Sequence, residues 1–231
     1  MANPTTEGIT AWSLSRLTTY EGCPRQAYYK FVKKLKEPKG QAMERGIKIH
    51  EQAEALLVRG GRVPADLKLM EEQLKELKKL KPLVEIEYAF TAKWEPTDWF
   101  GSIKPAWCRV KADALVPPVA DADEPEVRVI DFKTGKIKAH GEYDDQLELY
   151  GLAGLLTFPT AVRATGELWF LDHNEVVQTA EPVLRAQAPK LQKKWELRVK
   201  KMLNDKRFDP KPGNSCRWCH FRRANNGPCE Y

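Results

Sequence analysis

The sequence has 231 residues, of which 42% are hydrophobic and 30% are charged, enough to bury one sizeable core, so we expect a single compact domain. No apolar run approaches the roughly 18 residues of a membrane span, and Met1 to Thr10 lack the features of a signal peptide. We therefore expect a cytoplasmic protein with no membrane partner. The net charge of +6 is compatible with a polyanionic partner, but it is equally compatible with a lysine-rich solvated surface.

The N-terminal part of the chain, residues 1–82, is predicted to be mainly helical. Two short helices are expected in residues 13–31, capped by Ser15 and interrupted at Gly22-Cys23-Pro24. Apolar residues at helical spacing then predict helices over residues 42–58, from which His50 projects, and over residues 67–80, which Pro82 ends.

The middle part, residues 83–180, has the alternation typical of strands, followed by a helical pattern. We predict a three-stranded meander, an exposed acidic loop, a helix and a late hairpin with an Asn turn. These elements are expected at residues 84–89, 107–116 and 127–133 for the strands, 120–126 for the loop, 143–158 for the helix, and 167–171 with 176–179 for the hairpin. The remaining residues, 181–231, are expected to form a long basic helix over 184–203 and an irregular cysteine-rich tail.

Two apolar runs each present a carboxylate. Val129-Ile130-Asp131-Phe132-Lys133 places Asp131 and Lys133 two residues apart, and alternation puts both on one face of a strand. Asp113 lies in the preceding run, so neighbouring strands could bring the two carboxylates together. Close carboxylates repel each other unless a divalent cation lies between them, and Mg²⁺ or Mn²⁺ prefers such oxygen ligands. A water on that ion could attack phosphorus while Lys133 offsets developing charge, although an Asp-x-Lys tripeptide alone is often only a surface ion pair.

With these motifs in their order, the chain resembles the RecB-like branch of the PD-(D/E)XK nucleases. It is most similar to the four-cysteine exonucleases of CRISPR adaptation, to AddB-type nucleases of helicase-nuclease repair complexes and to their phage relatives, over Cys23 to Cys229. The resemblance implies an α/β fold with a central mixed sheet flanked by helices. It further implies Asp113, Asp131 and Lys133 as the catalytic core of a metal-dependent DNA exonuclease.

Further site residues are implied by the same resemblance. The Gly-x-x-x-His pattern ending at His50 matches the family's helical metal ligand, and the carbonyl of Phe132 is implied to touch the metal. Gln146 and Tyr150 match the family's Gln-x-x-x-Tyr helix, where Gln146 would orient Lys133 or a phosphate. Tyr150 would contact DNA or simply pack in the core. Glu87, on the strand before Asp113, is a weaker candidate for the site. The chain departs from the family at Val110, a position that is often Gly in the family.

The five cysteines are unevenly spaced, and a cytoplasmic setting favours metal ligation or burial over disulfides. Cys216, Cys219 and Cys229 have ligand spacing, and Cys23 is the natural fourth ligand of a tetrahedral site. Cys108 has no place in this pattern and is expected to be buried.

The resemblance implies that these four thiolates hold a structural [4Fe–4S] cluster that ties the two ends of the chain together. Zn²⁺ is the alternative, with Cys23 or His220 completing the site, and unligated thiols are the remaining one. Several residues around the cysteines could contact phosphates or a base, although the indole of Trp218 could equally pack over the cluster. They are Arg217, Trp218, Arg222 and Arg223.

Three classes of function are consistent with these patterns. The first is an exonuclease acting on single-stranded or end-containing DNA in recombination, repair or viral DNA processing, in the host cytoplasm if virus-encoded. The second is a DNA-binding module without activity, which the intact Asp113, Asp131 and Lys133 set argues against. The third is a redox or iron sensor built on the cysteines. Recombination or replication proteins are conceivable partners, and nothing in the sequence predicts self-association, cleavage polarity or the number of metals.

Overall fold

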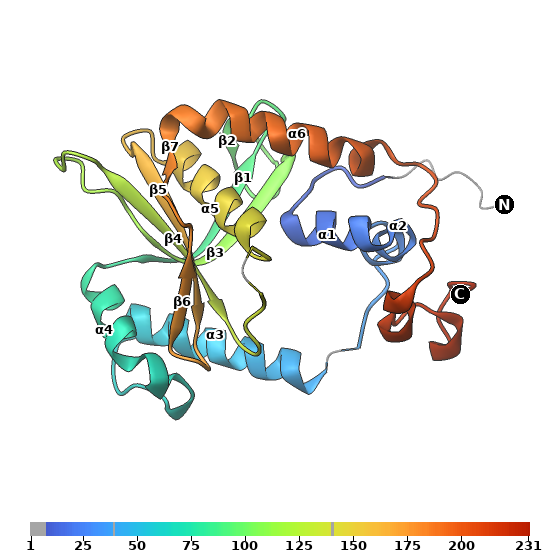
Figure 1. The fold of residues 1–231 in the computed structure, drawn as a ribbon, viewed down its shortest axis with the longest axis horizontal. Coiled ribbons are helices and arrows are strands. Elements are labelled where there is room, and N and C mark those ends of the chain that lie inside the picture. The colour runs from blue at the N-terminus through green and yellow to red at the C-terminus, as the bar shows by residue number, and fades with distance from the viewer. Residues whose placement is uncertain (1–7, 39, 140) are drawn as a thin grey trace.

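The computed structural model describes residues 8–38, 40–139 and 141–231. A mixed sheet with helices on both faces forms its centre (Figure 1). The strand order is β2-β1-β3-β4-β5-β6, with β7 also paired to β5. The bounds are β1 Leu83–Phe90, β2 Pro96–Thr97, β3 Cys108–Val116, β4 Glu126–Lys133, β5 Arg163–Phe170, β6 Glu175–Gln178 and β7 Val183–Leu184. The expected α/β fold with a mixed central sheet is therefore confirmed.

The predicted meander is present, since β1, β3 and β4 are antiparallel neighbours. β4 then pairs with β5 in parallel, and helix α5 (Asp144–Thr157) connects the two strands. A parallel pair needs such a crossover because the chain has to return to the other end of the sheet. The late hairpin joins β5 to β6 through Asn174, whose positive φ of 50° suits the tight turn that the sequence predicted.

The two faces of the sheet bury separate cores. One face packs against α5, α6 (Ala188–Asn204) and the N-terminal helices, with Val129 and Trp195 fully buried. The other packs against α3 (Gln41–Arg59) and α4 (Glu71–Lys79), with Ile130 and Phe132 fully or almost fully buried. Alternate residues of β4 thus serve opposite cores, which explains its continuous apolar run. In Figure 1, α5 and α6 lie on one side of the sheet, and α3 and α4 lie on the other.

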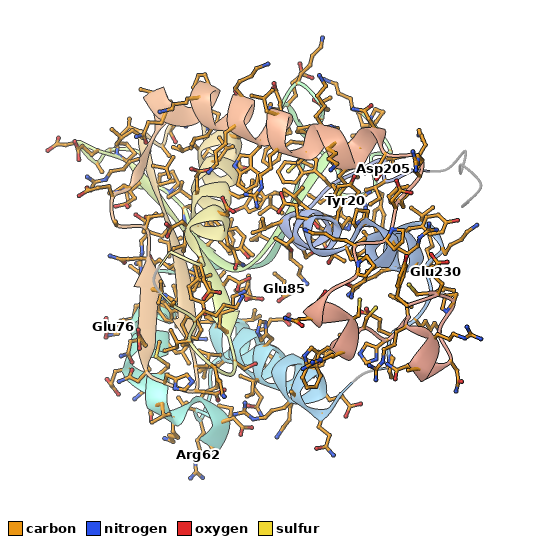
Figure 2. The ribbon with its side chains drawn as sticks, turned by 45° about the vertical axis from the view of Figure 1, so that its right-hand side comes forward. Tyr20, Arg62, Glu76, Glu85, Asp205 and Glu230 are labelled. Atoms are coloured by element: carbon orange, nitrogen blue, oxygen red, sulfur yellow. The ribbon has the colours of Figure 1, made fainter. Side chains whose placement is uncertain are left out.

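The chain's N-terminal helices lie beside its C-terminal tail (Figure 1). Helix α1 (Leu14–Gly22) and helix α2 (Pro24–Ala27) are separated at Cys23, as predicted, and α2 continues as a π-helix over Tyr28–Val32. Tyr20 donates a 2.6 Å hydrogen bond to Asp205 just beyond α6, and Figure 2 shows these two side chains together. The tail contains two short 3₁₀ segments, Asn214–Trp218 and Arg223–Asn225.

Three element boundaries differ from those expected. The N-cap of α1 is Ser13, which accepts from the amide of Arg16, whereas Ser15 lies inside the helix. The basic helix begins at Ala188 because Leu184 belongs to β7 and a 3₁₀ turn, Arg185–Gln187, follows. The segment expected as one helix from residue 67 divides into a 3₁₀ turn, Ala65–Met70, and α4. No helix among the described residues is long and apolar enough to cross a membrane.

Candidate active site

The candidate site lies where strands β3 and β4 separate. Their pairing runs from Val116 opposite Arg128 to Ala114 opposite Ile130. The same register places Asp113 opposite Asp131 at the next position, where no ladder pair is formed. The backbone N–H of Phe132 donates a 2.5 Å hydrogen bond to Asp113 Oδ2. The carboxylate therefore replaces the carbonyl of β3 as the acceptor for this N–H, where the β3–β4 pairing ends.

Within β3, the side chains switch from one core to the other at the position of Asp113. Val110 and Ala112 belong to the core under α5, whereas Ala114 belongs to the core under α3. Asp113 stands at this change of face and its side chain reaches α3, where Oδ1 lies 3.0 Å from His50 Nδ1. The hydrogen bond with Asp113 raises the pKa of His50, with burial opposing it.

Asp131 is held from the opposite layer. Tyr150 on α5 donates a 2.6 Å hydrogen bond to Asp131 Oδ1, and Gln146 donates a 2.7 Å bond to the Tyr150 hydroxyl. Both side chains lie one turn apart on one helix face, as their spacing predicted. Burial raises the pKa of Asp131, and the Lys133 ammonium in contact with Oδ2 opposes that rise. Oδ2 is buried and makes no other polar contact among the described residues.

The structure thus brings seven of the sequence-predicted residues into one connected group. They are His50, Asp113, Asp131, Phe132, Lys133, Tyr150 and Gln146. Gln146 contacts Tyr150 rather than Lys133, with which it shares no hydrogen bond in the described chain. Tyr150 is 6% exposed and belongs to the core under α5, which favours the packing alternative for most of its ring. Glu87 is exposed and lies opposite Lys111 in the β1–β3 register, away from this group.

A groove leads from this group along the protein surface, and we call it the basic groove. It includes Lys133, Gln146 and Tyr150 of the site itself. Its other polar and aromatic lining comes from the start of α1, from the loop after β2, from β3, from the segment after β4, from α5 and from the end of β5. These residues are Ser13, Ser15, Thr18, Trp99, Arg109, Lys111, Thr134, Lys136, Lys138, Glu142, Tyr143, Asp145 and Phe170. Trp99 and Arg109 were not singled out from the sequence, although Lys133-x-x-Lys136-x-Lys138 is a visible basic signal.

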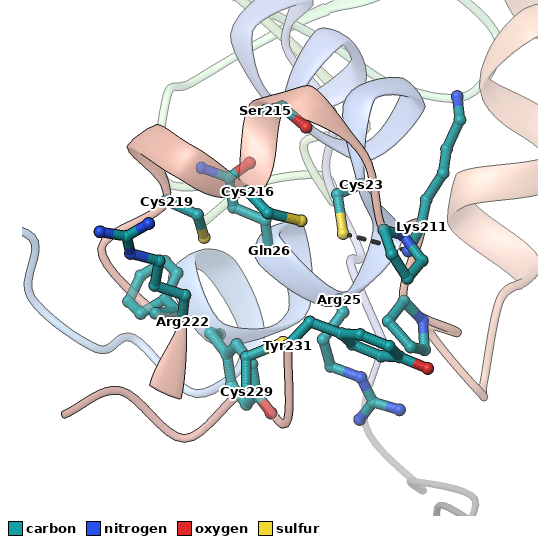
Figure 3. A pocket seen from close by; sticks show the side chains of 14 residues that line it. Cys23, Arg25, Gln26, Lys211, Ser215, Cys216, Cys219, Arg222, Cys229 and Tyr231 are labelled. Atoms are coloured by element: carbon teal, nitrogen blue, oxygen red, sulfur yellow. Dashed lines mark hydrogen bonds between the residues drawn. The ribbon is translucent and has the colours of Figure 1, made fainter. Parts of the chain in front are cut away.

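The four predicted ligand cysteines line one pocket between the N-terminal helices and the tail (Figure 3). All are free thiols, and two sulfurs accept backbone N–H groups: Cys23 from Lys211 at 3.5 Å and Cys216 from Gly213 at 3.4 Å. Burial, with the nearby thiols adding to it, raises the pKa of Cys219. Cys108 is fully buried in the core under α5, as expected.

The expected cysteine cluster is not supported by this arrangement. Across the part of the chain that the structure describes, no three His, Cys, Asp or Glu side chains form a group that could hold a metal ion. The same finding covers His50, Asp113 and Asp131. In the catalytic group, His50 Nδ1 lies 3.0 Å from Asp113 Oδ1 and the Lys133 ammonium contacts Asp131 Oδ2.

Comparison with known proteins identifies the fold. The model of the PD-(D/E)XK nuclease superfamily matches residues 11–116 and 109–224. A crystal structure from Eubacterium rectale, named "Putative exonuclease", has a TM-score of 0.53 at 12% identity, covering 96% of this chain and 89% of that chain. The crystal structure of SSO0001 is 16% identical, with a TM-score of 0.42 over 94% of this chain and 86% of that chain. No curated protein matches the sequence.

Proposed function

The chain belongs to the PD-(D/E)XK nuclease superfamily, and we propose that it is a Mg²⁺- or Mn²⁺-dependent exonuclease that hydrolyses the phosphodiester bonds of DNA. The observation that carries this proposal is the meeting of Asp113, Asp131 and Lys133 where two strands separate, at the end of a basic groove. Single-stranded or end-containing DNA is the proposed substrate, in recombination, repair or viral DNA processing.

The donor set suits a hard divalent cation. Asp131 Oδ2 is a buried carboxylate oxygen whose one polar contact within the described part of the chain is the Lys133 ammonium, and Asp113 supplies a second carboxylate. We propose that these carboxylates, the carbonyl of Phe132 and the Nε2 atom of His50 hold the ion, because His50 Nδ1 is already bonded to Asp113. When bound, such an ion supplies Lewis-acid stabilisation of the phosphate and lowers the pKa of a water molecule.

The chain's own residues have separate tasks in this proposal. Tyr150 fixes Asp131 through Oδ1, so Oδ2 stays directed toward Lys133. Gln146 fixes Tyr150 and therefore acts as a positioning residue. The Lys133 side chain is 29% exposed, so its ammonium can leave Asp131, approach the scissile phosphate and offset the charge that develops during phosphoryl transfer.

Substitution of Lys133 by alanine should lower the cleavage rate by about a hundredfold or more, because one preorganised charge next to the reacting group is lost. The measurement is digestion of end-labelled single- and double-stranded DNA with Mg²⁺ or Mn²⁺ and with EDTA. The matched control is Lys75→Ala, which removes a half-exposed lysine of α4 that pairs with Glu71 and lies outside the lining of the basic groove. The proposal is contradicted if Lys133→Ala cuts as fast as the control. A protein that binds DNA without metal-dependent cleavage would instead be the non-catalytic binding module.

For the cysteines we propose a structural [4Fe–4S] cluster on Cys23, Cys216, Cys219 and Cys229, with Zn²⁺ as the alternative. The four thiols share one pocket, and the two N–H···S contacts would favour thiolates there. To bind one cluster, the four cysteine sulfurs would have to move closer together within this pocket. Because the tail has few buried residues, ligation would supply folding free energy where packing supplies little.

Substitution of Cys219 by alanine should remove most bound iron and destabilise the protein by about 4 kcal/mol or more. Protein purified without oxygen should contain about four iron atoms per chain, measured by metal analysis together with thermal unfolding. Cys108→Ala is the control: it removes a buried core thiol and should keep the iron. About one zinc per chain would establish the alternative, and the absence of both metals from the intact protein would refute a ligated site.

A further inference from the structure

A loop beside the basic groove exposes large apolar side chains. It spans residues 98–105, between β2 and β3. Phe100 is 82% exposed and Ile103 is 84% exposed, although side chains of this size normally lose contact with water. Trp99, next to Phe100, lines the same groove as Lys133 and Tyr150. The loop that carries the two apolar side chains therefore contributes one residue, Trp99, to the groove that contains Lys133 and Tyr150.

The loop is held in a fixed shape despite its exposure. The Asp98 carboxylate accepts backbone hydrogen bonds from Phe100, Ser102 and Ile103 at 3.0–3.1 Å. These bonds lower the pKa of Asp98 to about 2, so its charge is committed to the loop itself. The hydroxyl of Thr97 also donates to the carbonyl of Lys104. Phe100 and Ile103 are thus presented on an ordered backbone, which lowers the entropy cost of contacts they make with a ligand.

The groove wall next to this loop has positive charge without a matching carboxylate. The guanidinium carbon Cζ of Arg109 lies 5.4 Å from the centroid of the Trp99 ring, and Arg109 Nε is buried without a hydrogen-bond partner among the described residues. A guanidinium group that lines the groove beside Trp99 and has an unpaired buried Nε in the described chain favours an anion such as a phosphate.

From this juxtaposition we infer that residues 98–105 form a nucleobase-contacting element for single-stranded DNA, with Phe100 and Ile103 against the bases and Arg109 on a phosphate. The inference rests on the proposed nuclease function and adds the part of the substrate that is recognised. A single strand is required because the bases of a duplex are stacked and paired, and their faces cannot reach exposed apolar side chains. Arg109 suits the phosphate of a nucleotide, and Phe100 and Ile103 suit its base.

The test separates base contacts from phosphate contacts. Binding of a labelled deoxythymidine oligonucleotide is compared with binding of an abasic strand of equal length and charge, with Ca²⁺ replacing Mg²⁺ to limit cleavage. The intact protein should prefer the strand with bases by about tenfold. The double variant Phe100→Ala with Ile103→Ala should lose most of this preference and keep its salt dependence. Arg109→Ala should weaken binding to both strands and reduce the salt dependence by about one phosphate contact.

Leu197→Ala is the matched control, since Leu197 is also exposed but lies on α6, outside the lining of the groove. All these positions are at least partly exposed, and thermal unfolding verifies that each variant is folded. Equal binding of both strands by the intact protein, no binding of either, or an unchanged preference in the double variant would each overturn the inference. Separate cleavage assays with Mg²⁺ report on the nuclease proposal. Base-dependent binding without cleavage would therefore remove the proposed activity and leave the loop's role intact.

Discussion

Replacement of Asp131 by asparagine should lower the cleavage rate by about a thousandfold and leave the metal-free protein at least as stable as before. The loss of rate follows because a neutral amide is a poor ligand for a divalent cation whose stabilisation of the transition state is worth several kcal/mol. The stability result follows from the electrostatics of the site. Asp131 is buried beside Asp113, and burial raises the pKa of its carboxyl, so the ionised form is disfavoured in the folded protein.

Asparagine preserves the shape and the acceptor atom that Tyr150 uses. The matched control is Asp66→Asn, which removes an exposed carboxylate whose pKa is lowered by its hydrogen bonds with Lys48 and Gln52. The ionised form of Asp66 stabilises the folded protein, so Asp66→Asn should be slightly less stable than the parent protein and fully active. Thermal unfolding in EDTA and single-turnover cleavage measure the two effects. A variant of Asp131 that keeps a tenth of the rate, or unfolds well below the intact protein, would contradict this account.

A single methyl group at Gly166 should destabilise the protein by about 3 kcal/mol or more and reduce cleavage with it. Gly166 lies in β5, directly under α5, and a Cβ atom there would stand 2.4 Å from the carbonyl oxygen of Leu147 and 2.9 Å from its Cα. Backbone atoms cannot yield as a flexible side chain can, so Gly166→Ala would push α5 away from the sheet. Gln146 and Tyr150 are on that helix, and Asp131 would lose its hydrogen bond.

Gly22→Ala is the corresponding control, because a Cβ at Gly22 meets no atom within 4 Å. This variant should unfold at or above the temperature of the parent protein, since alanine also loses less backbone entropy in a helix. Denaturant unfolding followed by circular dichroism gives both free energies. If Gly166→Ala unfolds within about 1 kcal/mol of the control, α5 is not seated as closely on β5 as the structure indicates.

Much of the fold was predictable because its signals are local. Alternation marked β1, β3 and β4, and helical spacing marked α3 and α5 to within two residues. The N-cap at Ser13 and the pairing of Leu184 in β7 were missed because each depends on a contact made after folding. The parallel pairing of β4 with β5 could not be derived either, since periodicity within a strand does not name its neighbour. The division into three parts along the chain stays a prediction.

The sequence predicted which residues form the candidate site, but not most of the contacts between them. Motif spacing and resemblance selected Asp113, Asp131 and Lys133, and the register shows why the two carboxylates meet. The hydrogen bond of Gln146 to Tyr150 depends on helix placement, which no spacing specifies. Arg109 and Trp99 come from segments whose sequence carries no motif, so only their positions in space connect them with the site.

The two carboxylates lie between the two hydrophobic cores, and this position matters for a partly folded chain. One carboxylate is oriented by His50 from the layer of α3, and the other by Tyr150 from the layer of α5. A chain that has packed only one side of its sheet would therefore hold only one of them in place. On the proposed function, a centre that needs both carboxylates would therefore form only when the helices on both faces have packed against the sheet.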